Sequence, residues 1–281
     1  MVEGLGMEGR RKWVLAPLLV AGVIALIQYF GAERFVNPET GRAARVAISP
    51  EQESELGLQS YRQVLAQEDV VTSGPEVDLV TRVARRLAAV TGEAARQFDW
   101  QVSVVRSPQV NAFCLPGGKI VVYTGILPVA KTEAGLATVM GHEMAHATSR
   151  HGAQRIFQSQ MANTLMQGAQ MSVALGDMSV DQQRAILGAI GAGAKFGVIL
   201  PFSRDHESEA DAVGLMYMAR AGYDPRESVE FWERMAAASQ GGQPPEFAST
   251  HPAHETRIEN LKAMMPRAVQ EYEQATAGKA P

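Results

Sequence analysis

The sequence has little cysteine, few aromatic residues and no strong excess of either charge. Cys114 is the single cysteine among 281 residues, so no intrachain disulfide can form. Its neighbours Phe113 and Leu115 favour a small core residue over a nucleophile. A net charge of −4 gives no reason to expect a nucleic-acid partner. Hydrophobic residues make up 46% of the chain, which is enough to form the core of one large domain or two small ones.

Charged residues are also missing from the whole segment between Lys12 and Glu33. An uncharged run of this length can cross a bilayer as a helix, and Trp13 and Tyr29 fit the aromatic belts at its two ends. A cleaved signal peptide is the alternative. Its apolar run is usually shorter and ends in a small-x-small cleavage site, which this segment lacks. The sequence therefore favours a retained single-pass membrane anchor at residues 13–32, after a flank at residues 1–12, which brings membrane lipid into contact with this helix.

The basic residues beside this segment give its orientation. Arg10, Arg11 and Lys12 favour the cytoplasmic side for the amino terminus, although Arg34 and later arginines weaken the asymmetry. The rest of the chain is therefore expected on the non-cytoplasmic, periplasmic side of a membrane.

Helical and strand patterns follow one another beyond the anchor. Residues 33–48 are interpreted as a linker. Ser49 and Gln52 form a capping box that predicts a helix to about residue 67, and Pro75 begins a second helix. Alternating residues predict strands at 100–104, 111–115 and 119–124. We expect a mainly helical α+β fold with a small antiparallel sheet, a domain at residues 49–266, and a loosely ordered tail at 267–281.

Residues 158–200 are rich in alanine, glycine and methionine. A second membrane span is one interpretation of the later part of this segment. Only ten uncharged residues, 185–194, follow one another there, which is too few to cross a bilayer. A close-packed helical hairpin, lying on the sheet or on a membrane surface, is therefore favoured.

The chemistry of the chain centres on Gly141-His142-Glu143-Met144-Ala145-His146, an H-E-x-x-H sequence on a helix that Thr132 can cap. Residues four apart share one helix face, so His142 and His146 can direct two imidazoles at one cation. Glu143 can reach a water bound to that cation, which is the zinc-peptidase signature with the glutamate as general base. A solvated helix face that carries two histidines by chance is the alternative. His151 lies off the ligand face and is interpreted as a supporting or packed residue.

A third ligand is offered by an acidic helix predicted from residue 205 to about residue 220. Glu207 and Asp211 share one face of it. A catalytic zinc site uses three protein ligands, and a metal-bound imidazole needs an acceptor for its second nitrogen. Glu207 as ligand and Asp211 as the residue that orients a ligand histidine meet both needs, while His206 and Glu209 are weaker candidates. An ordinary acidic helix face is the alternative, and it leaves the two histidines without a third ligand.

Together these motifs resemble the membrane-associated zinc metallopeptidases of the CAAX prenyl endopeptidase family. The resemblance is to the branch with bacterial periplasmic chaperone-proteases and a mitochondrial inner-membrane stress protease. The matching segments are Asn37–Gly41, Asn111–Phe113 with Pro116–Gly118, His142–His146, Glu207–Asp211, and Ser249–Pro252 with Arg257. The resemblance implies a gluzincin-like metallopeptidase domain with one Zn²⁺ per chain. It also implies His142, His146 and Glu207 as zinc ligands, Glu143 as the catalytic base and Asp211 as a support of the site.

The resemblance also implies a regulatory role for His251, because the histidine of the His-Pro motif approaches and closes the zinc site in some relatives. A lone histidine beside proline is otherwise most simply a turn residue. Tyr123, His251 and Arg257 are possible oxyanion helpers. An extended substrate can lie beside the strand that ends at Tyr123, or the edges of the sheet can be covered and purely structural.

The sequence therefore predicts a membrane-anchored zinc metalloendopeptidase that cleaves misfolded or damaged membrane or envelope proteins by attack of a zinc-bound water. The rival hypothesis is a chaperone-like or assembly factor with a latent zinc site, plugged by His251 or by residues 195–206. Relatives with assembly activity often carry a helical-repeat domain at the carboxyl terminus, which is not expected within these residues. A purely structural metal site is disfavoured, because such sites are usually closed by four ligands and need no general base.

Overall fold

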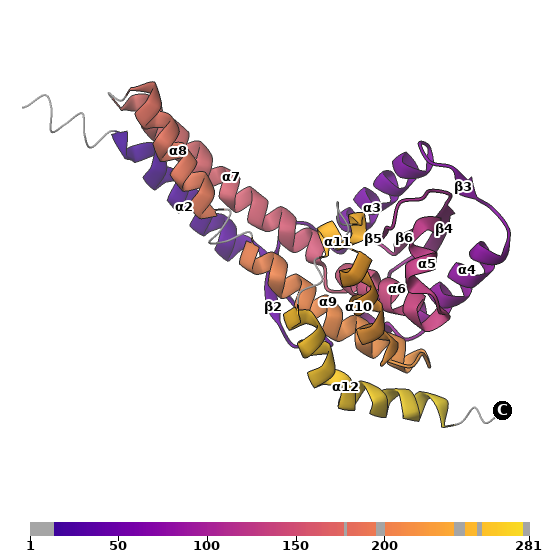
Figure 1. Cartoon of the computed structure of the whole chain (residues 1–281). Coiled ribbons are helices and arrows are strands. Elements are labelled where there is room, and N and C mark those ends of the chain that lie inside the picture. Colours follow the sequence, from indigo (N-terminus) through magenta and orange to yellow (C-terminus); the bar gives the residue numbers. More distant parts are fainter. Residues whose placement is uncertain (1–13, 177–178, 195–199, 239–244, 252–254, 278–281) are drawn as a thin grey trace, which may run out of the picture. The chain divides into compact units, whose positions relative to one another are not determined.

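The computed structural model describes residues 14–176, 179–194, 200–238, 245–251 and 255–277. Two compact units make up the chain: residues 1–36, 43–48 and 153–205 form the first, and residues 37–42, 49–152 and 206–281 form the second. The elements, most of which are labelled in Figure 1, are α2 (Ala16–Gly31), β1 (Glu33–Val36), β2 (Ala43–Val46), α3 (Pro50–Leu65), β3 (Val70–Val71), α4 (Pro75–Ala88), η1 (Gly92–Ala95), β4 (Gln101–Val105), β5 (Ala112–Leu115), β6 (Lys119–Tyr123), η2 (Thr124–Ile126), α5 (Leu127–Ala130), α6 (Glu133–Thr148), α7 (His151–Leu175), α8 (Val180–Ala194), α9 (Leu200–Arg220), α10 (Glu227–Ala238), α11 (Glu246–Thr250) and α12 (Glu255–Thr276).

The first unit contains α2, the β1–β2 hairpin, α8 and most of α7. Helices α2 and α7 approach so closely that a Cβ on Gly168 would lie 2.3 Å from the Cβ of Ala21. The two helices expected between residues 158 and 200 are α7 and α8, and a Cβ on Gly191 would lie 3.5 Å from the Met166 side chain. Residues 33–48, expected as a linker, instead hold two antiparallel strands. Their four-residue strands are too short to give a clear alternating pattern.

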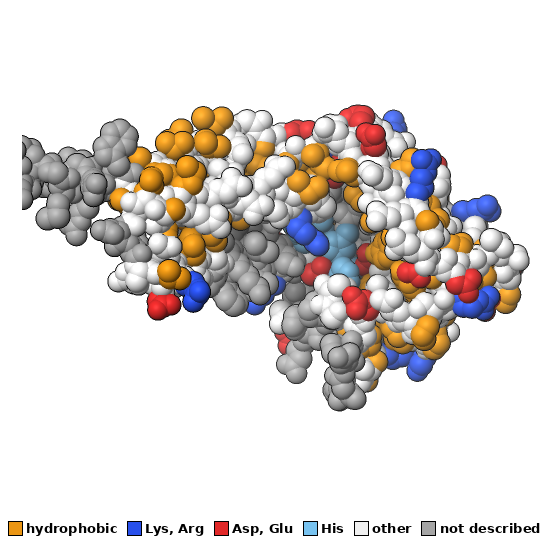
Figure 2. Space-filling view, turned by 90° about the horizontal axis from the view of Figure 1, so that it is seen from above, with side chains coloured by type: hydrophobic (Ala, Val, Ile, Leu, Met, Phe, Trp, Pro, Cys, Tyr) orange, Lys and Arg blue, Asp and Glu red, His pale blue; other side chains and the backbone are white. Residues whose placement is uncertain are grey.

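The transmembrane anchor expected at residues 13–32 is not borne out. The helix found there, α2, begins at Ala16 and holds 16 residues. None of the helices in the described part of the chain combines the length and apolar character needed to cross a bilayer. Hydrophobic side chains of the first unit gather at its surface, among them Leu19, Ile27 and Phe30 (Figure 2). Residues 1–13, which include the expected flank and Trp13, lie outside the described residues.

The sheet of the second unit has the strand order β3–β4–β6–β5. Strand β6 pairs in parallel with β4 on one side and antiparallel with β5 on the other. The three predicted strands are present, but the expected antiparallel sheet is therefore mixed, and β3 was not predicted. A short turn specifies the β5–β6 hairpin locally, whereas only tertiary packing selects the partner of β4. Since β6 has a neighbour on each side, no peptide can add beside the strand that ends at Tyr123.

The two faces of β6 belong to different clusters of buried side chains. Ile120 and Val122 join the main core with residues of α6, whereas Val121 and Tyr123 join a smaller cluster that includes Tyr61 of α3. Helix α6 is buried from Gly135 to Thr148. As predicted, Thr132 caps the first turn of this helix, because its hydroxyl accepts a hydrogen bond from the N–H of Gly135. Polar residues on so deeply buried a helix need partners, because an unpaired buried polar group costs free energy.

Helices α6 and α9 touch at a pair of glycines. A Cβ on Gly214 would lie 2.8 Å from both the carbonyl carbon of Gly141 and the backbone nitrogen of His142. Any larger residue at position 214 would therefore push α9 away from α6. Glu207 lies about two turns before Gly214 on α9, so this close approach determines how near its carboxylate comes to the histidines of α6.

Some helix boundaries differ from the predicted ones. Helix α6 ends at Thr148, soon after the H-E-x-x-H sequence, and α7 begins at His151. Between them Arg150 adopts a φ of 55°, in the left-handed region that breaks a helix. The tail expected to be loosely ordered from residue 267 is helical as far as Thr276, since α12 continues to that residue.

Candidate metal centre

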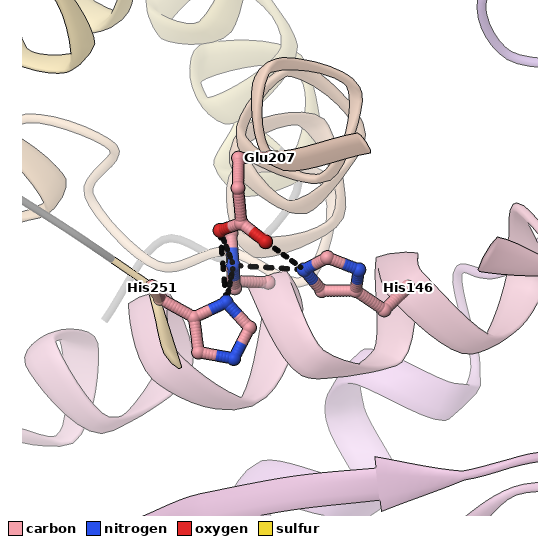
Figure 3. Close-up of side chains that lie close together, drawn as sticks. His146, Glu207 and His251 are labelled. Atoms are coloured by element: carbon pink, nitrogen blue, oxygen red, sulfur yellow. Dashed lines mark hydrogen bonds and ion pairs between the residues drawn. The ribbon is translucent and has the colours of Figure 1, made fainter. Parts of the chain in front are cut away.

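Four side chains of the second unit direct ligand atoms at one point: those of His142, His146, Glu207 and His251. The four atoms all lie within 4.8 Å of one another. Nε2 of His142 lies 3.1 Å from Nε2 of His146. Oε2 of Glu207 lies 3.3 Å from Nε2 of His142, and Oε1 lies 3.3 Å from Nε2 of His146. Figure 3 shows the Glu207 carboxylate facing the rings of His146 and His251. Histidine side chains are visible on the face shown in Figure 2, with acidic side chains beside them.

The donor set fits zinc. Imidazole nitrogen and carboxylate oxygen are the ligands that zinc takes in peptidases. Glu143 follows His142 on α6, and its Oε1 atom is buried without a hydrogen-bond partner in the described residues. Buried polar atoms are nearly always satisfied, so an unsatisfied carboxylate oxygen beside such a cluster fits a general base. This carboxylate also faces the backbone N–H of Cys114, which opposes the effect of burial on its pKa.

His142 is oriented from behind by a carboxylate. Its Nδ1 atom lies 2.9 Å from Oδ1 of Asp211, which leaves Nε2 directed at the cluster. Arg257 in turn holds Asp211, with Nε 2.6 Å from Oδ2 and a second nitrogen 2.9 Å from Oδ1. The same guanidinium donates to Glu207 at 2.9 Å and lies over the Trp232 ring. The structure thus places Asp211 and Arg257 directly behind the ligand atoms.

Burial and neighbouring charges shift the pKa values of the imidazoles and carboxylates in this site. Burial alone would lower the pKa of His142, but Asp211 and Glu207 raise it to about 9. Burial alone would raise the pKa of Glu207, but hydrogen bonds from His142, His146 and His251 hold it well below the usual range. Burial lowers the pKa of His146 and so favours its neutral imidazole. Burial also raises the pKa of Glu143, which suits a base that must hold a proton during a reaction.

His251 reaches the cluster from the end of α11. Its Nδ1 lies 2.8 Å from Oε2 of Glu207, and its Nε2 lies 3.4 Å from Oε1 of Glu143. Its backbone is tied at both ends, because its N–H donates to the Phe247 carbonyl and its own carbonyl accepts from Arg257. His251 therefore lies between the base and the ligand carboxylate. The neighbouring residues of the His-Pro motif, 252–254, lie outside the described part of the chain, as do residues 195–199 of the other proposed plug.

Tyr123 is not brought to the cluster. Its ring lies in the smaller hydrophobic cluster, on the face of β6 opposite to the main core, and its hydroxyl donates to Glu68 at 3.1 Å. Alternation along β6 decides this position, because residue 123 points to the face opposite to residues 120 and 122. An oxyanion role for Tyr123 therefore has no support from the structure.

His151, treated above as supporting or packed, touches a ligand. Its Nδ1 lies 2.8 Å from Nδ1 of His146, and its Nε2 lies 2.9 Å from Oε2 of Glu209. Glu209 was a weak candidate ligand in the sequence, because it lies off the face of α9 that carries Glu207. Its place in the same acidic segment as Glu207 was the one feature of the sequence that pointed to a role near the site.

Comparison with known proteins agrees with this site. Residues 77–265 match the model of peptidase family M48. The mitochondrial metalloendopeptidase OMA1 of Schizosaccharomyces pombe is 35% identical over 265 residues, covering 93% of this chain and 74% of that protein. OMA1 of Saccharomyces cerevisiae is 31% identical, covering 92% of this chain and 76% of that protein. The β-barrel assembly-enhancing protease of Escherichia coli strain K12 is 28% identical, covering 96% of this chain and 56% of that protein.

These matches correct the family inferred from the motifs. The resemblance to CAAX prenyl endopeptidases is wrong, because the family model that matches is that of peptidase family M48, and the relatives named above are OMA1 and a β-barrel assembly-enhancing protease. The H-E-x-x-H motif and the helix that carries Glu207 and Asp211 specify a metal site and a hydrolytic base. They carry no information on the substrate, so they could not identify a family that is named for its substrate. The family match, the identity to OMA1 and the cluster of histidine and glutamate ligands together identify the chain as a zinc metalloendopeptidase of peptidase family M48.

Proposed function

We propose that one zinc ion per chain is held by His142, His146 and Glu207, and that Glu143 is the catalytic base. One observation carries this proposal: helices α6 and α9 bring the three ligand atoms within 4.8 Å of one another, next to a buried carboxylate oxygen without a hydrogen-bond partner. The matched family supports a peptidase part within residues 49–266.

Zinc, when bound, lowers the pKa of its water and polarises a carbonyl oxygen. The residues of this chain perform the other tasks. Oε1 of Glu143 accepts a proton from the attacking water and passes it to the leaving amine. Asp211 lies 2.9 Å from Nδ1 of His142, so its charge favours a proton on that nitrogen and leaves the lone pair on Nε2, on the ligand side. Arg257 neutralises Asp211 and Glu207, and its engagement with both makes it a clamp on the site rather than an oxyanion donor.

An extended substrate fits beside β5 rather than β6. Strand β5 has one neighbour among the described strands, and its pairing with β6 includes a hydrogen bond from the Tyr123 N–H to the Asn111 carbonyl. Antiparallel pairs alternate, so the backbone groups of Ala112 and Cys114 face away from β6. The N–H of Cys114 already donates to Glu143, so this edge leads directly to the base. A peptide paired here would be held with one of its bonds near the metal.

We further propose that the substrates are unfolded or damaged membrane or envelope proteins. The support is the name of the relatives alone: a mitochondrial metalloendopeptidase and a protease that enhances β-barrel assembly. Placement outside the cytoplasm stays a prediction, because it depends on the membrane anchor expected at residues 13–32.

Zinc analysis of the purified full chain tests this assignment. We expect about one zinc per wild-type chain and almost none in His142→Ala, because two remaining ligands bind far more weakly than three. Thr91→Ala is the control, since Thr91 is as buried as His142 (both 2% exposed) but is not among the four clustered residues. Equal zinc content in wild type and His142→Ala would contradict the proposed ligand set.

A second function, a chaperone-like or assembly factor with a latent site, is favoured by the position of His251. Its imidazole lies between Glu143 and Glu207, where it would compete with substrate and water. If the chain is a self-restrained peptidase, His251→Ala should raise the rate of casein cleavage several-fold at unchanged zinc content. If the variant stays inert but still retains unfolded protein, the latent factor is the correct description.

A further inference from the structure

The proposed reaction leaves one buried group of residues unused. Glu209 lies on α9 only two residues after Glu207, is 6% exposed, and points away from the ligand cluster. Both of its oxygens accept hydrogen bonds from the turn between β1 and β2. Oε1 accepts from Asn37 (3.0 Å) and from the hydroxyl of Thr40, and Oε2 accepts from Nε of Arg42 (2.7 Å). This turn holds the Asn-Pro-Glu-Thr-Gly sequence, for which the reaction provides no role.

The same carboxylate continues to a metal ligand. Oε2 of Glu209 lies 2.9 Å from Nε2 of His151, and Nδ1 of His151 lies 2.8 Å from Nδ1 of His146. His151 is 1% exposed, and its ring stacks on that of His206 with centroids 4.2 Å apart. Its orientation is therefore constrained by both packing and hydrogen bonds. An unbroken path of short contacts joins the turn at residues 37–42 to the ring of His146.

The donors and acceptors along this path allow one arrangement of protons. Glu209 accepts from three side chains of the turn and pairs with a guanidinium, so its oxygens are acceptors and Nε2 of His151 must donate to it. A neutral imidazole protonated on Nε2 has an acceptor at Nδ1. Nδ1 of His146 must then carry the proton in the contact between the two rings. The lone pair of His146 is thereby left on Nε2, the atom that faces His142 and Glu207.

We propose that His151 and Glu209 are positioning residues of the metal centre, which fix the tautomer and orientation of His146, and that the turn at residues 37–42 holds Glu209 in place for this task. The proposal depends on His146 being a zinc ligand, as proposed above. It gives His146 a counterpart to the Asp211 carboxylate behind His142, with an imidazole inserted between carboxylate and ligand. Partners of ligand histidines typically contribute 10- to 100-fold in metal affinity.

Two variants test the path. Glu209→Gln keeps the shape but replaces one acceptor oxygen by an NH₂ group. Arg42 and His151 contact the same oxygen, Oε2, so the glutamine should keep its amide oxygen there and direct its NH₂ group at Asn37 and Thr40. The tautomers then stay unchanged, but the negative charge that holds His151 is lost. His151→Phe keeps a ring in the stack and removes the contact altogether. Glu53→Gln is the control, because Glu53 is as buried as Glu209 and is paired with Arg150 at 2.6 Å, but it touches none of the ligands in the contacts described.

Zinc affinity is measured on the full chain by competition with a chromogenic chelator, and His146 is followed in the chelator-treated protein by long-range ¹H–¹⁵N NMR correlations. We expect zinc binding about 10- to 100-fold weaker in Glu209→Gln and His151→Phe. We expect His146 protonated on Nδ1 in the wild type and in Glu209→Gln, and a mixture of both tautomers in His151→Phe, where the acceptor of the Nδ1 proton is gone. Glu53→Gln should bind zinc as the wild type does, even where its melting temperature falls, so a loss of affinity cannot be attributed to reduced stability alone.

The outcomes separate this proposal from the proposed function. If the wild type binds zinc tightly through His142 but both path variants bind it equally well, with an unchanged His146 tautomer, the positioning role is wrong and the peptidase assignment is unaffected. The same holds if Glu53→Gln loses as much affinity as Glu209→Gln. If the wild type binds no zinc, the ligand set fails and this inference fails with it.

Discussion

Glu143→Gln is expected to lower kcat for peptide cleavage by about 10²- to 10⁴-fold, the range that a positioned general base contributes. The glutamine keeps the size of the side chain and can still accept the N–H of Cys114, but it cannot accept a proton. The ligand atoms belong to other residues, so the zinc content should stay at the wild-type value. The measurement is single-substrate cleavage of a quenched peptide together with metal analysis of the same sample.

The control for this variant is Glu230→Gln, the same chemical change at a side chain that is 66% exposed on α10. It should cleave at the wild-type rate. If Glu143→Gln also cleaved normally, the unsatisfied oxygen beside the ligands would have no part in proton transfer. If it lost zinc as well as activity, Glu143 would have to be counted among the groups that hold the metal.

Arg257→Ala is expected to lower the free energy of unfolding by about 3–5 kcal/mol, the cost of removing one partner from a buried ion pair. The Arg257 guanidinium is 6% exposed and is bonded to both Asp211 and Glu207. Its removal leaves the buried Asp211 and the half-buried Glu207 without their arginine and exposes the face of Trp232 that it covers. The measurement is urea unfolding of the full chain in the presence of a chelator, which keeps metal binding out of the comparison.

Two further variants show whether the geometry, the charge or the burial of Arg257 accounts for its effect on the free energy of unfolding. Arg257→Lys restores the charge but not the two-point contact with Asp211, so it should recover only part of the loss. Arg82→Ala removes an arginine from an exposed pair with Glu133, where the side chain is 52% exposed, and should cost less than about 1 kcal/mol. Similar losses for Arg82→Ala and Arg257→Ala would mean that burial of the pair contributes nothing.

The elements that the sequence predicted well are those with local signals. Helix α3 has the capping box formed by Ser49 and Gln52, and α6 has the Thr132 cap. A cap satisfies backbone groups within one turn, so no distant residue is needed to specify where the helix begins. The β5–β6 hairpin is equally local, because its turn joins consecutive strands. The existence of these elements therefore follows from a few neighbouring residues.

The predictions that failed involve contacts between distant residues. The residues of the β1–β2 hairpin were interpreted as a linker. The turn of this hairpin is held by hydrogen bonds to Glu209, and a contact with a residue so far along the chain leaves no local signal in the sequence. The sheet was expected to be antiparallel because the register of β4 with β6 is chosen by packing and not by a turn. Tyr123 was a possible oxyanion helper, but it lies on the other face of β6. The alternation of a strand shows that it has two faces, and the sequence does not tell which of them meets α6.

The sequence by itself determined that His142, Glu143 and His146 lie on one helix, with the two imidazoles one turn apart on the same face, because the helical repeat sets the direction of each side chain. It also determined that a second helix carries Glu207 and Asp211 four residues apart. Only the tertiary structure decided that these two helices meet at Gly141 and Gly214, that His251 lies against Glu143, and that His151 and Glu209 connect to His146. The physical reason is that these contacts depend on the crossing of α6 and α9 and on the docking of a distant turn, and the periodicity of a single segment carries no record of either.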